Sequence, residues 1–222
     1  MKTLLETILS RKLFDPTTAI YNWLDEHNIK NYTINNGEID VDGDVDLSEC
    51  GLIEFSSFIR FGIVKGDFYC NGNTLTTLKG VPKTVGGNFF CFNNHLTTLE
   101  GAPEKVGRDF ICTYNKLTTL EGSPREVRGD FDCSHNNLTT LEGAPRKVKV
   151  NFYCDDNKLT TLVGAPERVG WSFDCSHNNL TTLEGAPRKI GGAFFCNSNK
   201  TQFTEDDVRR VCKVKHEISI HV

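Results

Sequence analysis

A motif that returns every 21 residues restricts what this chain can fold into more than any other feature of the sequence. Each copy is centred on a cysteine, with phenylalanine two residues before it and asparagine three residues after it. The cysteines of the motif are Cys70, Cys91, Cys112, Cys133, Cys154, Cys175 and Cys196. A fixed period of roughly 20 to 50 residues indicates a repeat solenoid, in which each copy forms one turn of a stack.

The apolar positions of each copy are expected to point inward and to stack on their equivalents in the neighbouring turns. One copy cannot bury its apolar face alone, so only the array is stable. The cysteine serves as a small apolar side chain in this arrangement. Parallel strands lie about 4.8 Å apart and aim equivalent Cβ atoms alike, which exceeds the usual ~3.8 Å Cβ separation of a disulfide. We therefore expect free thiols, although the chain has nine cysteines.

The asparagine of each copy is expected to turn inward and to bond backbone groups of the loop that follows the cysteine. A tight corner of a solenoid leaves peptide groups that water cannot reach, and the amide side chain offers both a donor and an acceptor. The asparagines are Asn73, Asn94, Asn115, Asn136, Asn157, Asn178 and Asn199. The sequence thus predicts a structural ladder along one edge of the stack.

The order apolar-x-apolar-x-x-Asn-x-Leu-x-x-Leu resembles the leucine-rich repeat, and Phe68, Cys70, Asn73, Leu75 and Leu78 show it in this chain. The resemblance implies a mainly β repeat solenoid with a parallel β-sheet on the concave face. The chain departs from that family in its phenylalanine and cysteine, and its unit has no room for a full helix on the convex side. The Gly-Ala-Pro segment favours an extended or turn-like return path there.

The sequence Leu-Thr-Thr-Leu-Glu-Gly-Ala-Pro, together with Gly-Gly-x-Phe-x-Cys, resembles a family of short leucine-rich-repeat proteins of bacteriophages and gut bacteria, mostly without assigned function. The resemblance covers about residues 30 to 222. It implies a fold rather than an activity. If it holds, it implies a host protein as partner.

Residues 1–44 are expected to form an N-terminal cap. Leu4, Leu5, Ile8 and Leu9 recur at helical spacing, and Pro16 opens a second helical segment that carries Ile20, Trp23 and Leu24. The sequence Asn35-Asn36-Gly37 predicts a hairpin turn between this cap and the solenoid.

Residues 45–203 are expected to form the solenoid and residues 204–222 a small α/β C-terminal cap. A degenerate first repeat places Val45 and Leu47 where later copies carry phenylalanine and cysteine. Thr204-x-x-Asp207 is typical of a helix start, ahead of Val208, Val211 and Cys212, and residues 216–222 alternate like an edge strand.

The composition of the chain argues against two classes of partner. The formal net charge of −4 offers no basic excess for a nucleic-acid backbone or an anionic membrane, so neither is expected as a partner. The first residues contain no uninterrupted apolar stretch of signal-peptide type, and no segment approaches the ~18 apolar residues of a membrane span. We expect a cytoplasmic protein, in the bacterial host if a phage encodes it.

The variable residues around the two inward strand positions can change without disturbing the stack, and they are the candidate binding residues. Their first half is aromatic and apolar and their second half is acidic, and exposed aromatic residues are frequent interface anchors. The alternative is that aromatic side chains simply suit a strand surface. The candidates are Tyr69, Phe90, Phe92, Ile111, Tyr114, Asp132, Tyr153, Asp155, Asp174 and Phe195.

Other functions have weaker support. His135 and His177 share a slot and have Asp132 and Asp174 nearby, but two turns separate them by about 9.6 Å, too far for one metal ion. No cofactor motif or catalytic constellation is present, and Cys212 is expected to be a buried structural thiol. The sequence therefore predicts a monomeric, non-enzymatic adaptor or inhibitor that binds a protein or peptide. The alternatives are a structural virion component and an effector substrate-reader similar to the repeats of bacterial ubiquitin ligases.

Overall fold

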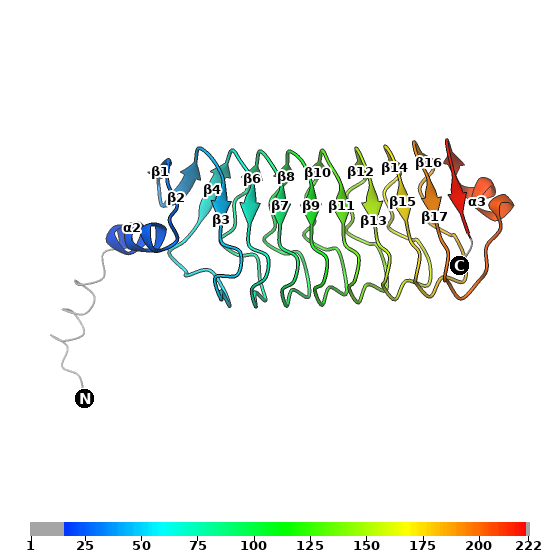
Figure 1. Cartoon of the computed structure of the whole chain (residues 1–222), viewed down its shortest axis with the longest axis horizontal. Helices are drawn as coiled ribbons and strands as arrows, with labels where there is room; N and C mark the ends of the chain where they lie inside the picture. The colour runs from blue at the N-terminus through cyan, green and yellow to red at the C-terminus, as the bar shows by residue number, and fades with distance from the viewer. Residues whose placement is uncertain (1–15, 221–222) are drawn as a thin grey trace, which may run out of the picture.

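The computed structural model describes residues 16–220 as a rod of stacked turns. Figure 1 shows two rows of short strands running along the rod, which we name sheet A and sheet B. Within the described residues sheet A has ten strands and sheet B has nine. The predicted class, a mainly β repeat solenoid, is confirmed.

Each turn contributes one strand to each sheet, and neighbouring strands are parallel except for the first pair. In spatial order, sheet A consists of β1 (Tyr32–Asn35), β2 (Glu38–Val41), β4 (Phe61–Val64), β6 (Thr84–Val85), β8 (Lys105–Val106), β10 (Glu126–Val127), β12 (Lys147–Val148), β14 (Arg168–Val169), β16 (Lys189–Ile190) and β18 (Lys213–Val214). Sheet B consists of β3 (Val45–Asp46), β5 (Phe68–Tyr69), β7 (Phe89–Phe90), β9 (Phe110–Ile111), β11 (Phe131–Asp132), β13 (Phe152–Tyr153), β15 (Phe173–Asp174), β17 (Phe194–Phe195) and β19 (Ile218–Ser219).

The regular part of sheet A was not predicted, because the sequence indicated one sheet and an extended or turn-like return path. Its strands from β6 onward are two residues long, too short for a recognisable alternation of apolar and polar residues. Each pairs an outward polar residue with an inward Val or Ile, as Lys105 and Val106 do in β8. The proline precedes the strand, so its missing N–H removes no hydrogen bond from the ladder.

Phenylalanine rings fill the core between the sheets. Phe89, Phe110, Phe131 and Phe152 stack face to face with ring centroids 5.2–5.4 Å apart, because the parallel register places equivalent residues on adjacent strands. The cysteines beside them are buried and free, as predicted. Several thiols, such as that of Cys133, also donate to a carbonyl of the next turn, here the Tyr153 oxygen at 3.2 Å.

The asparagine ladder is confirmed. The Asn136 amide nitrogen lies 3.1 Å from the carbonyl oxygens of Cys112, Cys133 and Ser134, and its side-chain oxygen accepts the Leu117 N–H at 3.0 Å. One buried side chain therefore ties its own corner to the preceding turn.

A second corner of each turn requires glycine. Gly122 has a φ of +88°, and a Cβ placed there would lie 2.5 Å from the carbonyl oxygen of Leu99 in the preceding turn. Both the left-handed backbone and the close approach exclude a side chain at this corner. The glycine of the Gly-Ala-Pro segment is thus explained by sterics.

The N-terminal cap begins, within the described residues, with helix α2 (Pro16–Glu26), which buries Ile20, Trp23 and Leu24 against the first turns. The predicted hairpin is present: β1 and β2 are antiparallel, and Asn36 and Gly37 both have positive φ, as a type I′ turn requires. The predicted helix around Leu4, Leu5, Ile8 and Leu9 lies outside the described residues.

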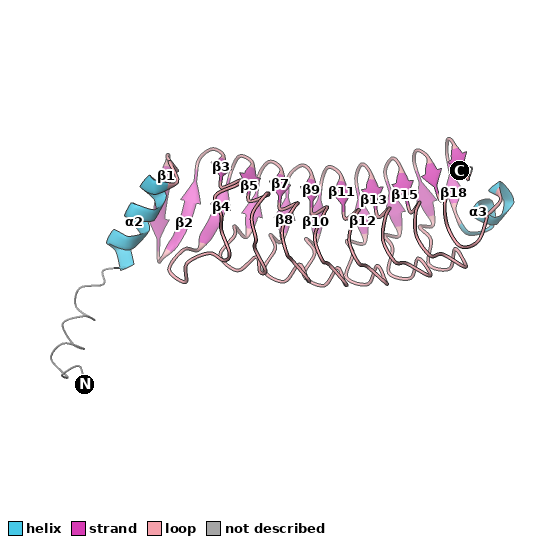
Figure 2. Cartoon of the chain, turned by 60° about the horizontal axis from the view of Figure 1, so that its bottom comes forward, coloured by secondary structure: helices cyan, strands magenta, loops and turns pink. Residues whose placement is uncertain are grey.

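Helix α3 (Glu205–Val211) lies at the other end of the rod, as Figure 2 shows. Thr204 and Asp207 form the predicted capping box at its start, and Val208 and Cys212 are buried as expected. Val211 is exposed instead, because the helix ends there and the chain turns into β18.

No helix among residues 16–220 has both the length and the apolar character to cross a membrane.

Candidate functional site

The outward residues of sheet B form one continuous line. Each pairs in register with its equivalent on the next strand, so chain positions 21 residues apart become neighbours. All of them are half-buried. The line consists of Tyr69, Phe90, Ile111, Asp132, Tyr153, Asp174 and Phe195; together with the flanking Phe92, Tyr114 and Asp155 we call it the strip.

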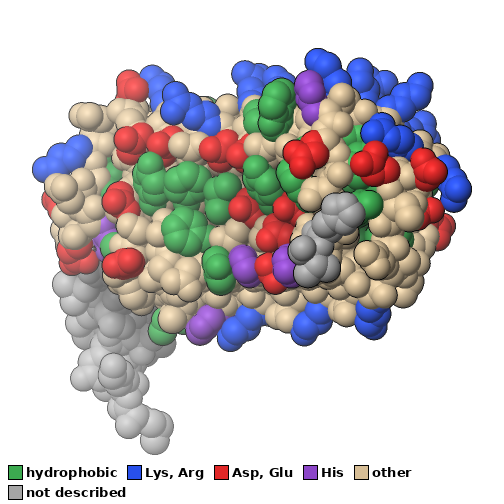
Figure 3. Space-filling model, turned by 45° about the vertical axis from the view of Figure 1, so that its right-hand side comes forward, with side chains coloured by type: hydrophobic (Ala, Val, Ile, Leu, Met, Phe, Trp, Pro, Cys, Tyr) green, Lys and Arg blue, Asp and Glu red, His purple; other side chains and the backbone are tan. Residues whose placement is uncertain are grey.

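The half of the strip near the N-terminal cap is aromatic. The rings of Tyr69 and Phe90 meet edge to face at 5.3 Å, and the rings of Phe90 and Phe92 lie 6.2 Å apart. The Tyr69 hydroxyl donates to Asp67 at 2.9 Å, and this bond and partial burial raise the pKa of Tyr69 to about 12. Hydrophobic side chains accordingly gather in one patch on this face in Figure 3.

Tyr114 stands beside this line in a strained backbone conformation. Its φ is +52°, a region where a bulky residue without special hydrogen bonding costs roughly 1–2 kcal/mol. The side chain is 58% exposed, and its ring stacks on that of His135 at 4.3 Å. Gly72 and Asn93 fill the equivalent slot in the two preceding turns, so the slot itself does not require an aromatic ring.

The other half of the strip is acidic. Burial raises the pKa of Asp132, against hydrogen bonds from Ser134, and the nearby charge of Asp155 raises it further. The pKa of Asp174 is raised for the same reasons, with Ser176 in the place of Ser134. These carboxyl groups are therefore partly desolvated, and their ionised forms lower the stability of the fold.

Three side chains in this half could hold a metal ion. His135, Asp155 and Asp156 each offer one ligand atom, and the three atoms lie within 4.8 Å of one another. The contacts between them need no ion, since Asp155 accepts the Ser134 hydroxyl at 2.5 Å and Asp156 lies 3.7 Å from the His135 ring nitrogen. Sequence reasoning had considered His135 with His177 and missed this group, whose carboxylates come from the next turn of the chain.

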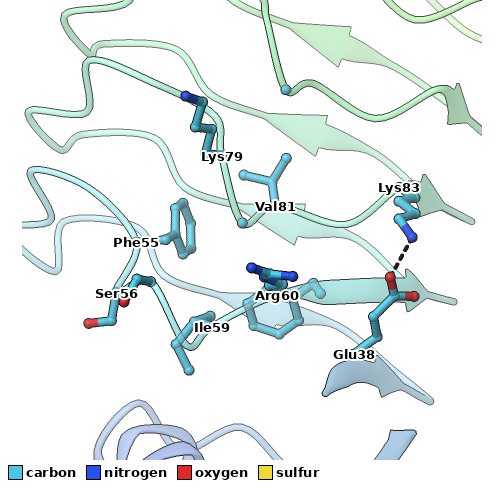
Figure 4. Close-up of a pocket in the computed structure, with 12 residues that line it drawn as sticks. Glu38, Phe55, Ser56, Ile59, Arg60, Lys79, Val81 and Lys83 are labelled. Carbon is cyan, nitrogen blue, oxygen red and sulfur yellow. Dashed lines mark hydrogen bonds and ion pairs between the residues drawn. The ribbon is translucent and has the colours of Figure 1, made fainter. Parts of the chain in front are cut away.

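A cavity of about 520 Å³ lies on another side of the rod, where the degenerate first turn meets the regular ones. Figure 4 shows Phe55, Ile59 and Val81 around it and Glu38 bonded to Lys83 at its edge. Ser56 and Ser57 are the hydroxyl groups of its lining, and no histidine lies in that lining to activate them. The cavity therefore shows no serine and histidine pair of the kind that activates a nucleophile.

No protein-family model matches the chain, and a search of curated proteins finds no significant match. The surface chemistry of the solenoid therefore carries the functional argument alone.

Proposed function

We propose that this chain is a non-enzymatic protein-binding module whose strip holds a segment of a host protein. The observation that carries the proposal is the unbroken contact of Tyr69, Phe90 and Phe92 on an outward face, next to Ile111 on the following strand. Aromatic side chains of this kind supply most of the affinity in protein interfaces.

The size of the strip favours a peptide or loop as the bound segment. Seven strands at about 4.8 Å give a length of ~29 Å, and the width is on the order of 13 Å. This area is well below the ~800 Å² that each partner of a standard interface buries. The charge pattern favours a segment with apolar residues at one end, over Phe90, and basic residues at the other, over Asp132 and Asp174.

Strain at Tyr114 supports a binding role. The backbone conformation of Tyr114 lowers the stability of the fold, and its ring stacks only at the surface. A contact between this ring and a partner would account for a tyrosine at this position.

We further propose that the protein acts as a monomer in the cytoplasm of a bacterial host, where its nine free thiols stay reduced.

The test is affinity capture from bacterial lysate with three baits analysed by quantitative mass spectrometry. One bait is the unchanged protein, and one carries alanine at Tyr69, Phe90, Ile111 and Tyr153. The matched control carries alanine at Ile53, Ile63 and Val163, which are exposed apolar residues outside the strip. A partner retained by the unchanged and control baits and lost by the strip bait supports the proposal.

A second arm avoids any loss of fold in the strip bait. A photo-reactive phenylalanine analogue at Phe92 should crosslink to the captured partner, and the same analogue at Val163 should not. Equal capture by all three baits, or crosslinking from Val163 alone, would remove the strip as the binding site.

A further inference from the structure

Sheet A carries a ladder of cations toward the C-terminal end of the rod. The outward residues Lys147, Arg168, Lys189 and Lys213 pair in register on four adjacent strands, and all four are exposed. Like charges on directly paired positions destabilise a sheet. Repulsion between these cations therefore lowers the stability of the sheet, and an anion bound along the ladder would reduce this repulsion.

The ladder borders a hollow of about 480 Å³. Its rim is formed by Lys147, Lys149, Arg168, Lys189, Lys215 and Trp171. Gly170 and Gly191 also line the hollow and occupy the slots between Lys149 and Lys215 in the stack. A Cβ on either glycine would lie about 2.0 Å or less from the carbonyl oxygen of the preceding turn, so the backbone itself keeps the hollow open.

The neighbouring acids form their ion pairs with other residues, and Glu167 and Glu126 act on Lys147 and Lys149 only at longer range. Glu167 is bonded to Arg146 at 2.5 Å, and Glu126 is bonded to Arg128 at 2.9 Å. Within residues 16–220 none of the cations around the hollow forms an ion pair. Figure 3 shows that Lys and Arg side chains gather along the margins of the face that it views rather than in its centre.

Trp171 adds a second kind of recognition. Its side chain is 54% exposed, and its ring leans toward that of His216, with centroids 5.7 Å apart. An exposed indole beside a row of cations matches the two requirements of single-stranded nucleic acid, a charged track for phosphates and a flat surface for a base. An acidic peptide would use the cations and would need no indole.

We propose that this hollow binds single-stranded nucleic acid, with the phosphodiester backbone along the cation ladder and a base stacked on Trp171. Four strands span about 14 Å, which is enough for a few nucleotides. The net charge of −4 does not oppose this, since the acidic side chains of the strip lie on the other sheet. The site is separate from the strip and does not depend on the proposed protein partner.

The test is fluorescence anisotropy with labelled oligothymidine and oligouridine, titrated with the whole chain at about 50 to 200 mM salt. The ladder variant is Lys147→Gln, Arg168→Gln and Lys189→Gln. Its matched control is Lys116→Gln, Lys158→Gln and Lys200→Gln, which removes the same charge from exposed positions in another corner of the turns. The ladder variant should bind more weakly, and its log affinity should depend on log salt with a slope smaller by about 2, at ~0.7 per phosphate lost.

Trp171→Ala should weaken binding by about 5- to 150-fold through loss of base stacking, with little change in the salt slope. Binding should also quench the fluorescence of Trp171, while Trp23 stays buried. The control variant and the strip variant should bind like the unchanged protein, so the two proposals fail independently.

Three results would overturn the proposal. They are no binding at the lowest salt, an equal loss in the ladder and control variants, and tighter binding of polyglutamate or of phosphatidylserine vesicles than of either oligonucleotide. The last result would assign the hollow to an acidic protein or to a membrane surface.

Discussion

The asparagine ladder predicts a large and position-dependent effect for Asn136→Asp. The replacement has the same shape, but it removes both amide hydrogens and places a carboxylate against three carbonyl oxygens, each 3.1 Å from the amide nitrogen. Each buried acceptor left without a donor costs about 1–3 kcal/mol. With two donor hydrogens lost in a buried corner, we expect the free energy of unfolding to fall by on the order of 2–6 kcal/mol.

The matched control is Asn199→Asp in the last regular turn. Asn199 makes the same contacts, to Cys175, Cys196 and Asn197, but it is only partly buried, so water can replace the lost donors. We expect its cost to stay below about 2 kcal/mol.

Urea denaturation followed by circular dichroism measures both costs, and hydrogen exchange shows which turns open. The effect of Asn136→Asp should shrink as pH falls, because a protonated carboxyl group regains one donor. A loss below about 1 kcal/mol at neutral pH, or equal losses for the two variants, would refute the view that these amides hold the corners.

Three further predictions concern single features. Gly122→Ala should cost about 2–5 kcal/mol in a denaturation experiment and Gly51→Ala only about 1–2 kcal/mol, because both have positive φ but only Gly122 lacks space for a Cβ; equal costs would contradict this. Tyr114→Asn should leave stability within about 1 kcal/mol, as strain relief offsets the lost ring contact, yet weaken capture of the strip partner at least about 5-fold. Because burial raises the pKa of Asp132 and Asp174, the folded protein binds more protons than the unfolded chain, and their contribution to stability falls as pH rises through the raised pKa values. The double variant Asp132→Asn and Asp174→Asn should therefore be more stable than the unchanged protein at neutral pH, with the difference vanishing below the unfolded pKa of about 3.9; denaturation midpoints across this range check the sign.

Periodicity made much of the fold predictable from the sequence. Because the turns repeat, a correct prediction for one turn holds for the others. The inward positions of Phe68 and Cys70, the ladder at Asn73 and the stacking of the array followed from the pattern in this way. The hairpin at Gly37 and the helix start at Thr204 followed from local turn and capping chemistry.

The regular part of the second sheet and the charged hollow were not predictable in the same way. Strands such as β12 are too short for an alternation signal, and a proline beside them indicates a turn. The cations of sheet A alternate along the chain with many acidic residues, so a net charge summed over all residues hides them. Aligning Lys147, Arg168 and Lys189 in the repeat register would have found the ladder, and the same alignment places Trp171 beside it.

The buried cysteines would allow the opening of individual turns to be counted by chemical modification. Each regular turn holds one thiol that solvent does not reach while its neighbours remain stacked, and burial raises the pKa of these thiols well above that of a free cysteine. A reagent that modifies thiolates therefore does not react with the cysteine of a closed turn, because it cannot reach the sulfur and because the thiol stays protonated. Apart from the exposed Cys50, the number of repeat cysteines modified in one molecule would report how many turns had separated, and their positions would show whether the rod opens from its ends or in the middle.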